Sequence, residues 1–264
     1  MQRHHVIRSL ILAALAAGAA RAGTAQTLET ETARLLPRGW WKIGNAYEFQ
    51  TSSEGREAAV PFIVEYGVTG RLELVVEPVP YAAIRPNRGR RARGAGDVEV
   101  TLTWLLRHES GGTPALALAA EVKLPTARDT LIGTRRTDYT GYLIASRRFG
   151  RLDTHANLAY TVVGRPAGAR VNNIIYAAVA GVYRPNARTE LFGEIFGNTA
   201  ASAEAESGTG PGGTTVTAEV AGGEVVGTLG AGRYVVPNLL LYGAVSYDNN
   251  RALLLRPGLT FRFR

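Results

Sequence analysis

The chain ends in the stretch LLLRPGLTFRFR, residues 253–264. Its apolar residues fall on one side of an extended backbone, namely Leu253, Leu255, Pro257, Leu259, Phe261 and Phe263. The intervening positions include Arg256, Thr260 and Arg262. Alternation with a period of two predicts a β-strand whose apolar face is covered and whose other face is polar. The cover is either a protein core inside a sheet or lipid outside it.

The same alternation recurs along the chain. Twelve segments carry it: 40–50, 58–67, 71–82, 96–108, 114–124, 138–149, 152–164, 171–184, 187–199, 224–236, 238–248 and 253–263. Most run ten to thirteen residues, roughly twice the usual strand of about five or six. A tilted strand needs about nine to eleven residues to cross a bilayer. Strand length therefore favours a membrane-spanning sheet.

The connections between these segments alternate in length. Short joints lie at 68–70, 108–114, 150–151, 185–186 and 237, and the other joints at 51–57, 83–95, 125–137, 165–170, 200–223 and 249–252 are mostly longer. Gly150 suits the first central position of a type II′ hairpin turn. We therefore predict an all-β fold over residues 40–264, a twelve-stranded antiparallel up-and-down transmembrane β-barrel with short periplasmic turns and longer extracellular loops.

A secreted β-sandwich or a lipocalin-like soluble barrel is the alternative fold. Such a soluble fold predicts shorter strands than these, and a polar face with fewer charged residues than this sequence carries. Aromatic residues near strand ends fit the interfacial girdles of a membrane barrel: Trp40, Trp41, Tyr66, Tyr81, Phe149, Tyr183, Tyr247, Phe261 and Phe263. These features favour the membrane barrel.

The N-terminus predicts export. Arg3 and Arg8 precede an apolar run over 10–20, which is too short for a membrane helix of about twenty residues. This pattern predicts a secretory signal peptide over 1–25, with cleavage after Ala22 or Ala25. Residues 26–39 are then expected to form a periplasmic segment before the barrel, and the protein is expected in the outer membrane of a Gram-negative cell.

Composition limits the partners. Lys and Arg exceed Asp and Glu by eight, and removal of three arginines with the signal peptide lowers this excess to five. Export argues against nucleic acid, so phosphate-bearing lipid or a small anion is the expected anionic partner. The chain has no cysteine, which excludes disulfides and thiolate metal sites. No motif predicts a metal site or a cofactor.

Charged and polar residues recur on the face opposite the apolar one. We expect them to line the lumen and to set charge selectivity: Glu65, Glu73, Glu77, Glu99, Arg107, Glu121, Lys123, Arg148, Asp153, His155, Asn157, Glu190, Glu194 and Arg256. A polar lumen predicts passive passage of small molecules. A non-conducting structural or adhesive barrel that acts through its extracellular loops is the alternative.

Pairing across the 150–151 turn places Ser146 opposite His155, with Asn157 two residues further on the same face. Such a set resembles a nucleophile, a base and an orienting group, and a lumen hydrolase is a third possibility. A hydrogen-bonded polar lumen explains the same residues without catalysis. We therefore predict no enzyme and no catalytic residues.

The stretch RPNRGRRARGAG lies in a predicted extracellular loop and carries Arg85, Arg88, Arg90, Arg91 and Arg93. Arginine binds phosphate with two parallel hydrogen bonds. The loop is expected to contact lipopolysaccharide or to attract anions towards the barrel mouth, unless it is simply solvated. The small, glycine-rich residues 200–223 predict a flexible outside loop or an inward plug.

Two resemblances add to this interpretation. The closing strand, with Phe263 next to last, resembles the recognition signal read by the barrel-assembly machinery, although Arg264 departs from its aromatic end. The stretches GDVEVTLTWLLRHE, PALALAAEVKLPT and TDYTGYLIASRRFGRLDTHANLAYTVVG resemble the outer-membrane transporter family linked to the MetA pathway of phenol degradation. This resemblance covers about residues 60–264 and implies passage of small molecules, including aromatic or hydrophobic ones.

Overall fold

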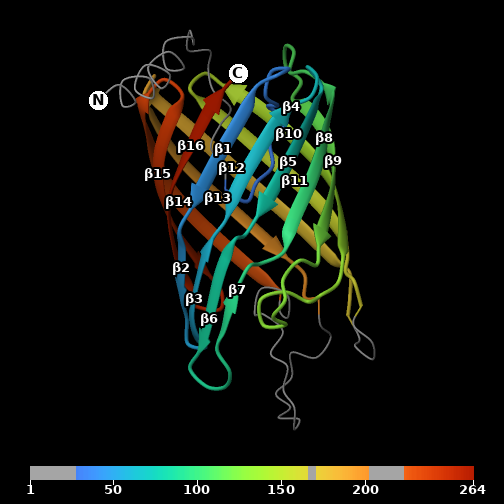
Figure 1. Cartoon of the computed structure of the whole chain (residues 1–264). Helices are drawn as coiled ribbons and strands as arrows, with labels where there is room; N and C mark the ends of the chain where they lie inside the picture. Colours follow the sequence, from blue (N-terminus) through green and yellow to red (C-terminus); the bar gives the residue numbers. More distant parts are fainter. Residues whose placement is uncertain (1–27, 166–170, 202–222) are drawn as a thin grey trace, which may run out of the picture.

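The computed structural model describes residues 28–165, 171–201 and 223–264. Their strands form one antiparallel sheet, which the pairing of β1 with β16 closes into a barrel (Figure 1). The strands are β1 (Trp41–Ala46), β2 (Glu48–Thr51), β3 (Gly55–Val60), β4 (Phe62–Gly67), β5 (Leu72–Pro78), β6 (Tyr81–Pro86), β7 (Ala92–Gly94), β8 (Val98–Arg107), β9 (Ala115–Leu124), β10 (Asp138–Phe149), β11 (Leu152–Val162), β12 (Ile174–Asn186), β13 (Thr189–Asn198), β14 (Glu224–Val236), β15 (Leu239–Asp248) and β16 (Leu253–Phe263). Within the described residues, no helix has the length and apolarity to cross a membrane.

These segments make twelve barrel strands, because each of the first four strands is interrupted once. β1 continues into β2, β3 into β4, β5 into β6 and β7 into β8. The last strand shows this continuity directly, since β16 pairs with β1 over one half and with β2 over the other. The predicted twelve-stranded antiparallel barrel is confirmed.

Prolines mark two of the interruptions. Pro61 separates β3 from β4, and it lacks the N–H that a ladder needs. Val79 and Pro80 separate β5 from β6. Pro78 and Tyr81 both face outwards although they are three residues apart, so this joint contains one residue more than strict alternation allows. Beyond the interruptions, β2, β3, β6 and β7 extend the barrel wall at the end opposite the C-terminus (Figure 1).

The outward face is apolar around the barrel. Large exposed side chains include Trp104, Leu143, Leu158, Val179, Ile195, Leu229 and Tyr247, and Leu229 exposes 75% of its surface. A continuous apolar belt of this kind is unfavourable in water and is the lipid-facing surface of membrane barrels. The inward face is polar and buried, and it includes Thr101, Thr103, Ser146, Asp153, His155 and Glu190. The chain is therefore an outer-membrane type of barrel.

The closing strand faces lipid as its sequence predicts. Phe263 lies opposite Trp41 and Phe261 opposite Ile43, all on the outward face. Arg262 points inwards opposite Lys42, and both side chains are buried. β16 thus pairs with β1 and closes the sheet into a barrel.

Short turns gather at the rim that holds the C-terminus (Figure 1). Gly150 has a positive φ of 60° whereas Arg151 does not, which agrees with the predicted type II′ turn between β10 and β11. Longer connections lie at the other rim. The predicted signal peptide over 1–25 and nearly all of the predicted loop over 200–223 fall outside the described residues.

Candidate functional site

Residues 28–36, which precede β1, occupy the lumen. The sequence predicts a periplasmic segment over 26–39, but residues 28–36 instead run inside the barrel and bond to inward-facing side chains of several strands. We call residues 28–36 the lumen segment. Its position makes it the central feature of the candidate site.

Asn157 holds the lumen segment as a neighbouring strand would. Its Oδ1 accepts from the Glu31 backbone N–H at 2.6 Å, and its Nδ2 donates to the Glu31 carbonyl oxygen at 2.9 Å. The Ser146 Oγ accepts the backbone N–H of Ala33 at 2.9 Å. Neutral side chains of β10 and β11 thereby satisfy the backbone groups that the segment buries.

Two carboxylates hold the ends of the lumen segment. Glu194 of β13 accepts the backbone N–H of Thr30 at 3.1 Å and its hydroxyl at 2.9 Å. Glu73 of β5 accepts the backbone N–H of Leu36. Because Glu73 and Glu194 lie on distant strands, the segment crosses the lumen rather than following one wall.

Arg34 adds an ionic anchor. It donates to Asp153 at 3.0 Å and also pairs with Glu109 in the β8–β9 turn. Arg148 pairs with the other oxygen of Asp153 at 2.6 Å, and Arg184 lies 3.8 Å from it. Asp153 has no exposed side-chain surface. A buried carboxylate with several guanidinium partners fixes the segment firmly, because losing any partner leaves uncompensated buried charge.

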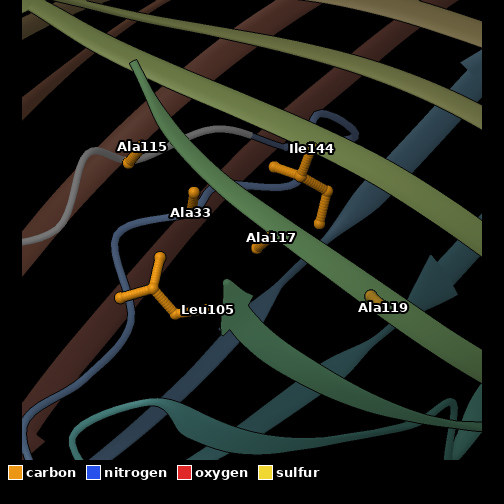
Figure 2. Packing of buried hydrophobic residues seen from close by; sticks show 6 residues of the cluster. All are labelled: Ala33, Leu105, Ala115, Ala117, Ala119 and Ile144. Atoms are coloured by element: carbon orange, nitrogen blue, oxygen red, sulfur yellow. The ribbon is translucent and has the colours of Figure 1, made fainter. Parts of the chain in front are cut away.

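Small side chains make room for the segment. Ala33 packs against the inward-facing Ala115, Ala117 and Ala119 of β9, with Leu105 and Ile144 completing the cluster (Figure 2). At Gly67 of β4, an added Cβ would lie 2.3 Å from the Pro37 carbonyl oxygen. Larger residues at these inward positions would collide with the segment.

Ser146 and His155 lie together as their register predicts, with the Oγ 2.8 Å from Nδ1. No orienting group completes a catalytic set, because His155 Nε2 has no hydrogen-bond partner within the described residues. Asn157 is bonded to Glu31 instead. The Ser146 hydroxyl is buried beneath Ala33. This arrangement anchors the lumen segment and offers no access to a substrate.

The wall formed by β12 to β16 is filled by aromatic side chains. Phe192 and Tyr242 meet edge to face with their ring centroids 6.4 Å apart, and Leu28 packs on the same cluster. Phe192 lies over Gly230, where an added Cβ would come within 2.2 Å of the ring. These rings fill part of the lumen on this side, and the open part of the lumen lies mainly against the first strands and β16.

That open part is a cavity of about 510 Å³. It extends from Gly133 and Thr134 of the 125–137 loop to Glu73 and the lumen segment. Its wall is rich in carboxylates, which are Glu29, Glu31, Glu48, Glu57, Glu65, Glu73, Glu77, Asp97 and Glu99, whereas its basic residues are Arg34, Lys42, Lys123 and Arg256. The cavity is acidic although the whole chain is basic.

The basic residues at the cavity are already paired. Lys42 pairs with Glu65, Lys123 with Asp138, and Arg256 with Glu29 at 2.6 Å. Arg256 also contacts Glu48 at 2.7 Å. The acidic excess is therefore not neutralised by these cations.

Glu77 and Glu99 carry part of that excess. They lie directly opposite each other on β5 and β8. In the part of the chain that the structure describes, neither carboxylate has an ion pair. Lys123 lies opposite Glu99 on β9, but it pairs with Asp138. Two facing carboxylates favour an additional cation near them. Within the same residues, no group of three or more His, Asp or Glu side chains could hold a metal ion.

The predicted selectivity residues divide into those inside the lumen and one outside it. Inward-facing are Glu65, Glu73, Glu77, Glu99, Glu121, Lys123, Arg148, Asp153, His155, Asn157, Glu190, Glu194 and Arg256. Arg107 instead lies exposed at the short-turn rim, where it donates to the Pro114 carbonyl oxygen at 3.2 Å. A register shift between Leu105 and Arg107 moves its side chain off the inward row.

The lumen segment itself supplies site residues that strand patterns do not reveal, namely Glu29, Glu31 and Arg34. The available signal is indirect. Alternate positions of β9 carry alanine on the face that points into the lumen. Because these side chains are small, they leave space in the lumen for another segment of the chain.

The arginine-rich loop is divided between two environments. Arg90 makes a two-pronged ion pair with Asp129 of the neighbouring loop, at 2.6 and 2.7 Å. This pairing lowers the pKa of Asp129 to about 2. Arg85 and Arg93 lie on β6 and β7, and Arg88 and Arg91 are exposed in the connection between these strands.

Comparison with known proteins supports the fold. No protein-family model matches the chain, and no curated protein matches it by sequence. Among solved structures, the COG4313 outer membrane channel from Pseudomonas putida F1 superposes with a TM-score of 0.64 at 13% identity, covering 90% of this chain and 100% of that one. The NanC porin gives 0.58 at 10% identity over 83% and 98% of the two chains.

The KdgM porin in complex with disordered oligogalacturonate gives a TM-score of 0.55 at 11% identity, with 84% of this chain and 99% of that chain covered. At such identities, the similarity establishes a shared fold, that of porin-like outer-membrane channels. Membership of the transporter family linked to phenol degradation stays a prediction.

Proposed function

We propose that the protein is an outer-membrane channel for small solutes, and that the lumen segment limits the width of its pathway. The acid-lined cavity carries this proposal. It begins at the long-loop rim and ends at the lumen segment, as expected for an entrance whose inner end is narrowed by another part of the chain. The fold shared with porins agrees with this role.

The charge of the cavity favours small cations over anions. Carboxylates such as Glu77 and Glu99 attract cations and repel anions, and a low-dielectric wall strengthens both effects. KdgM is solved with oligogalacturonate, an anionic sugar chain, and this cavity is unsuited to such a solute. The cavity is also lined by apolar side chains, among them Ile63, Val75 and Val79. We therefore propose organic cations, including those with an aromatic or hydrophobic body.

The test is the reversal potential across a planar bilayer under a potassium chloride gradient. The mature protein should prefer potassium, and Glu77→Gln combined with Glu99→Gln should reduce that preference. Arg107→Gln is the control, because Arg107 lies outside the cavity and should leave selectivity unchanged. Preference for chloride in the unmodified protein would contradict the proposed solute class, while leaving a channel function intact.

A non-conducting barrel is the second candidate, and the filled lumen favours it. The lumen segment is tied to β5, β10, β11 and β13, which would suit a permanent plug. Removal of residues 28–36 separates the two functions. A channel conducts before removal and conducts more afterwards. A protein that conducts only after removal is a plugged barrel, which would instead act through its outer loops.

A further inference from the structure

Outward-facing arginines lie at the long-loop end of the barrel wall. Arg56 of β3 is directly opposite Arg85 of β6. Arg93 of β7 lies opposite Ala83, two residues before Arg85 on the same face of β6. All three arginines are exposed. They form a compact set, which we call the rim arginines.

The rim arginines continue the lipid-facing surface. One row of directly opposed residues runs across five strands as Tyr247, Leu253, Thr51, Arg56 and Arg85. The row therefore changes from apolar to basic on a single outward face. Because Tyr247 exposes 54% and Leu253 37% of their surfaces, the apolar part of the row is open to lipid.

A second row repeats this change. It runs as Val245, Leu255, Phe49, Ala58, Ala83 and Arg93. The two rows lie two residues apart on each strand, so their side chains share the outward face. Hydrocarbon contacts and positive charges are thus adjacent at the boundary of the lipid belt.

The direct opposition of Arg56 and Arg85 requires an explanation. Like charges opposite each other in an antiparallel pair are destabilising. Across the described ranges, none of the rim arginines has an ion pair, whereas the neighbouring Arg90 is paired with Asp129. A shared anion would convert this repulsion into a favourable site.

We propose that the rim arginines bind the phosphate groups of a phosphorylated glycolipid in the outer leaflet. Arginine binds phosphate through a planar fork of donors, and two or three such forks at one place suit a phosphorylated head group. The acyl chains of the same lipid lie along Leu253, Leu255 and Phe49. The arginines face away from the acidic cavity, so they do not guide solutes into it.

The experiment measures binding of diphosphorylated lipid A to the detergent-refolded mature protein by native mass spectrometry. Changing Arg56, Arg85 and Arg93 to Gln should weaken binding about ten-fold or more, as expected from losing several charge-assisted hydrogen bonds. The matched control changes Arg107, Arg147 and Arg151 at the opposite rim to Gln, which removes the same charge. It should retain binding. A heat-dependent gel shift verifies that both variants fold.

Two further ligands identify the source of the phosphate. Dephosphorylated lipid A should bind the unmodified protein as weakly as lipid A binds the rim variant. Inorganic phosphate should compete poorly, because it lacks the acyl chains. Equal binding of lipid A by the unmodified and rim-variant proteins would overturn the proposal. Full competition by inorganic phosphate would show a general anion site and would overturn the lipid assignment.

Discussion

Asp153 shows how strongly one residue organises the lumen. Its side chain is fully buried, yet it meets guanidinium groups from Arg34, Arg148 and Arg184. Burying a carboxylate is costly unless charged partners and hydrogen bonds compensate it. Asp153 therefore links the lumen segment to the barrel wall, and its loss affects both.

Replacing Asp153 with Asn should lower the free energy of unfolding by about 3 kcal/mol. Arg148 loses its counter-ion, and Arg34 and Arg184 keep Glu109 and Glu190, respectively. Urea unfolding in detergent, followed by tryptophan fluorescence, measures the change. Asp129→Asn is the control, because the Arg90–Asp129 pair is exposed and such pairs contribute little. Equal effects in the two variants would contradict the central role of Asp153.

Glu109 gives the lumen segment a dependence on pH. Hydrogen bonds from Arg34 hold the pKa of the Glu109 carboxyl below its ordinary value of 4.5. Because the pKa of Glu109 is lowered, its contact with Arg34 contributes fully to stability above the ordinary pKa of the carboxyl. The contribution is lost as the pH falls through the lowered pKa. A spin label at position 38 should therefore be immobile from pH 8 to pH 5 and become mobile in stronger acid. In Glu109→Gln, the mobility of the label should be the same from pH 8 down to this stronger acid.

Among the secondary-structure elements, β4 comes close to the N-terminal residues at Gly67. An added Cβ at Gly67 would lie 2.3 Å from the Pro37 carbonyl oxygen and 2.8 Å from that of Leu36. Gly70 has no atom within 4 Å of such a Cβ. The two glycines therefore form a matched pair for testing the segment.

Gly67→Ala should displace the lumen segment and raise single-channel conductance. Overpacking costs about 1–3 kcal/mol, which shifts the population of the displaced state by roughly five-fold or more. Gly70→Ala should leave conductance unchanged. A Gly67→Ala channel that is fully folded, by its gel shift, and conducts like the unmodified protein would show that the segment does not limit the pathway.

The strands themselves were largely predictable. β10, β14 and β16 begin and end where alternation predicts, whereas β12 covers 174–186 instead of 171–184. The interruption between β5 and β6 was not predictable from alternation, because one extra residue changes the face of everything after it without changing composition. Pro61 and Pro80 mark two of the four interruptions.

For the whole molecule, strand count and connection length predict closure, because both describe the backbone alone. The path of residues 28–36 could not be predicted in this way, since it depends on contacts with Glu73, Ser146, Asn157 and Glu194, which come from four different strands. The same limit applies to the acidic cavity. Sequence indicates which face each carboxylate occupies, whereas the filled and empty parts of the lumen are decided by packing.

Closure in one register can be tested with disulfides, because the chain has no cysteine of its own. Ile43 lies opposite Phe261, and Gly44 lies opposite Thr260. Adjacent antiparallel pairs alternate between hydrogen-bonded and non-hydrogen-bonded types, so one of these two pairs has its Cα atoms about 4.5 Å apart. That distance permits a disulfide.

One of the double variants, Ile43→Cys with Phe261→Cys or Gly44→Cys with Thr260→Cys, should therefore cross-link readily. The bond joins the first and last strands, so denatured protein should migrate differently with and without reductant. Ile43→Cys with Leu259→Cys is the control, because diagonal partners lie roughly 7–8 Å apart and cross-link poorly. Preferential cross-linking of the control would mean that the barrel closes two residues out of this register, which would place Arg262 and Lys42 at different heights in the lumen.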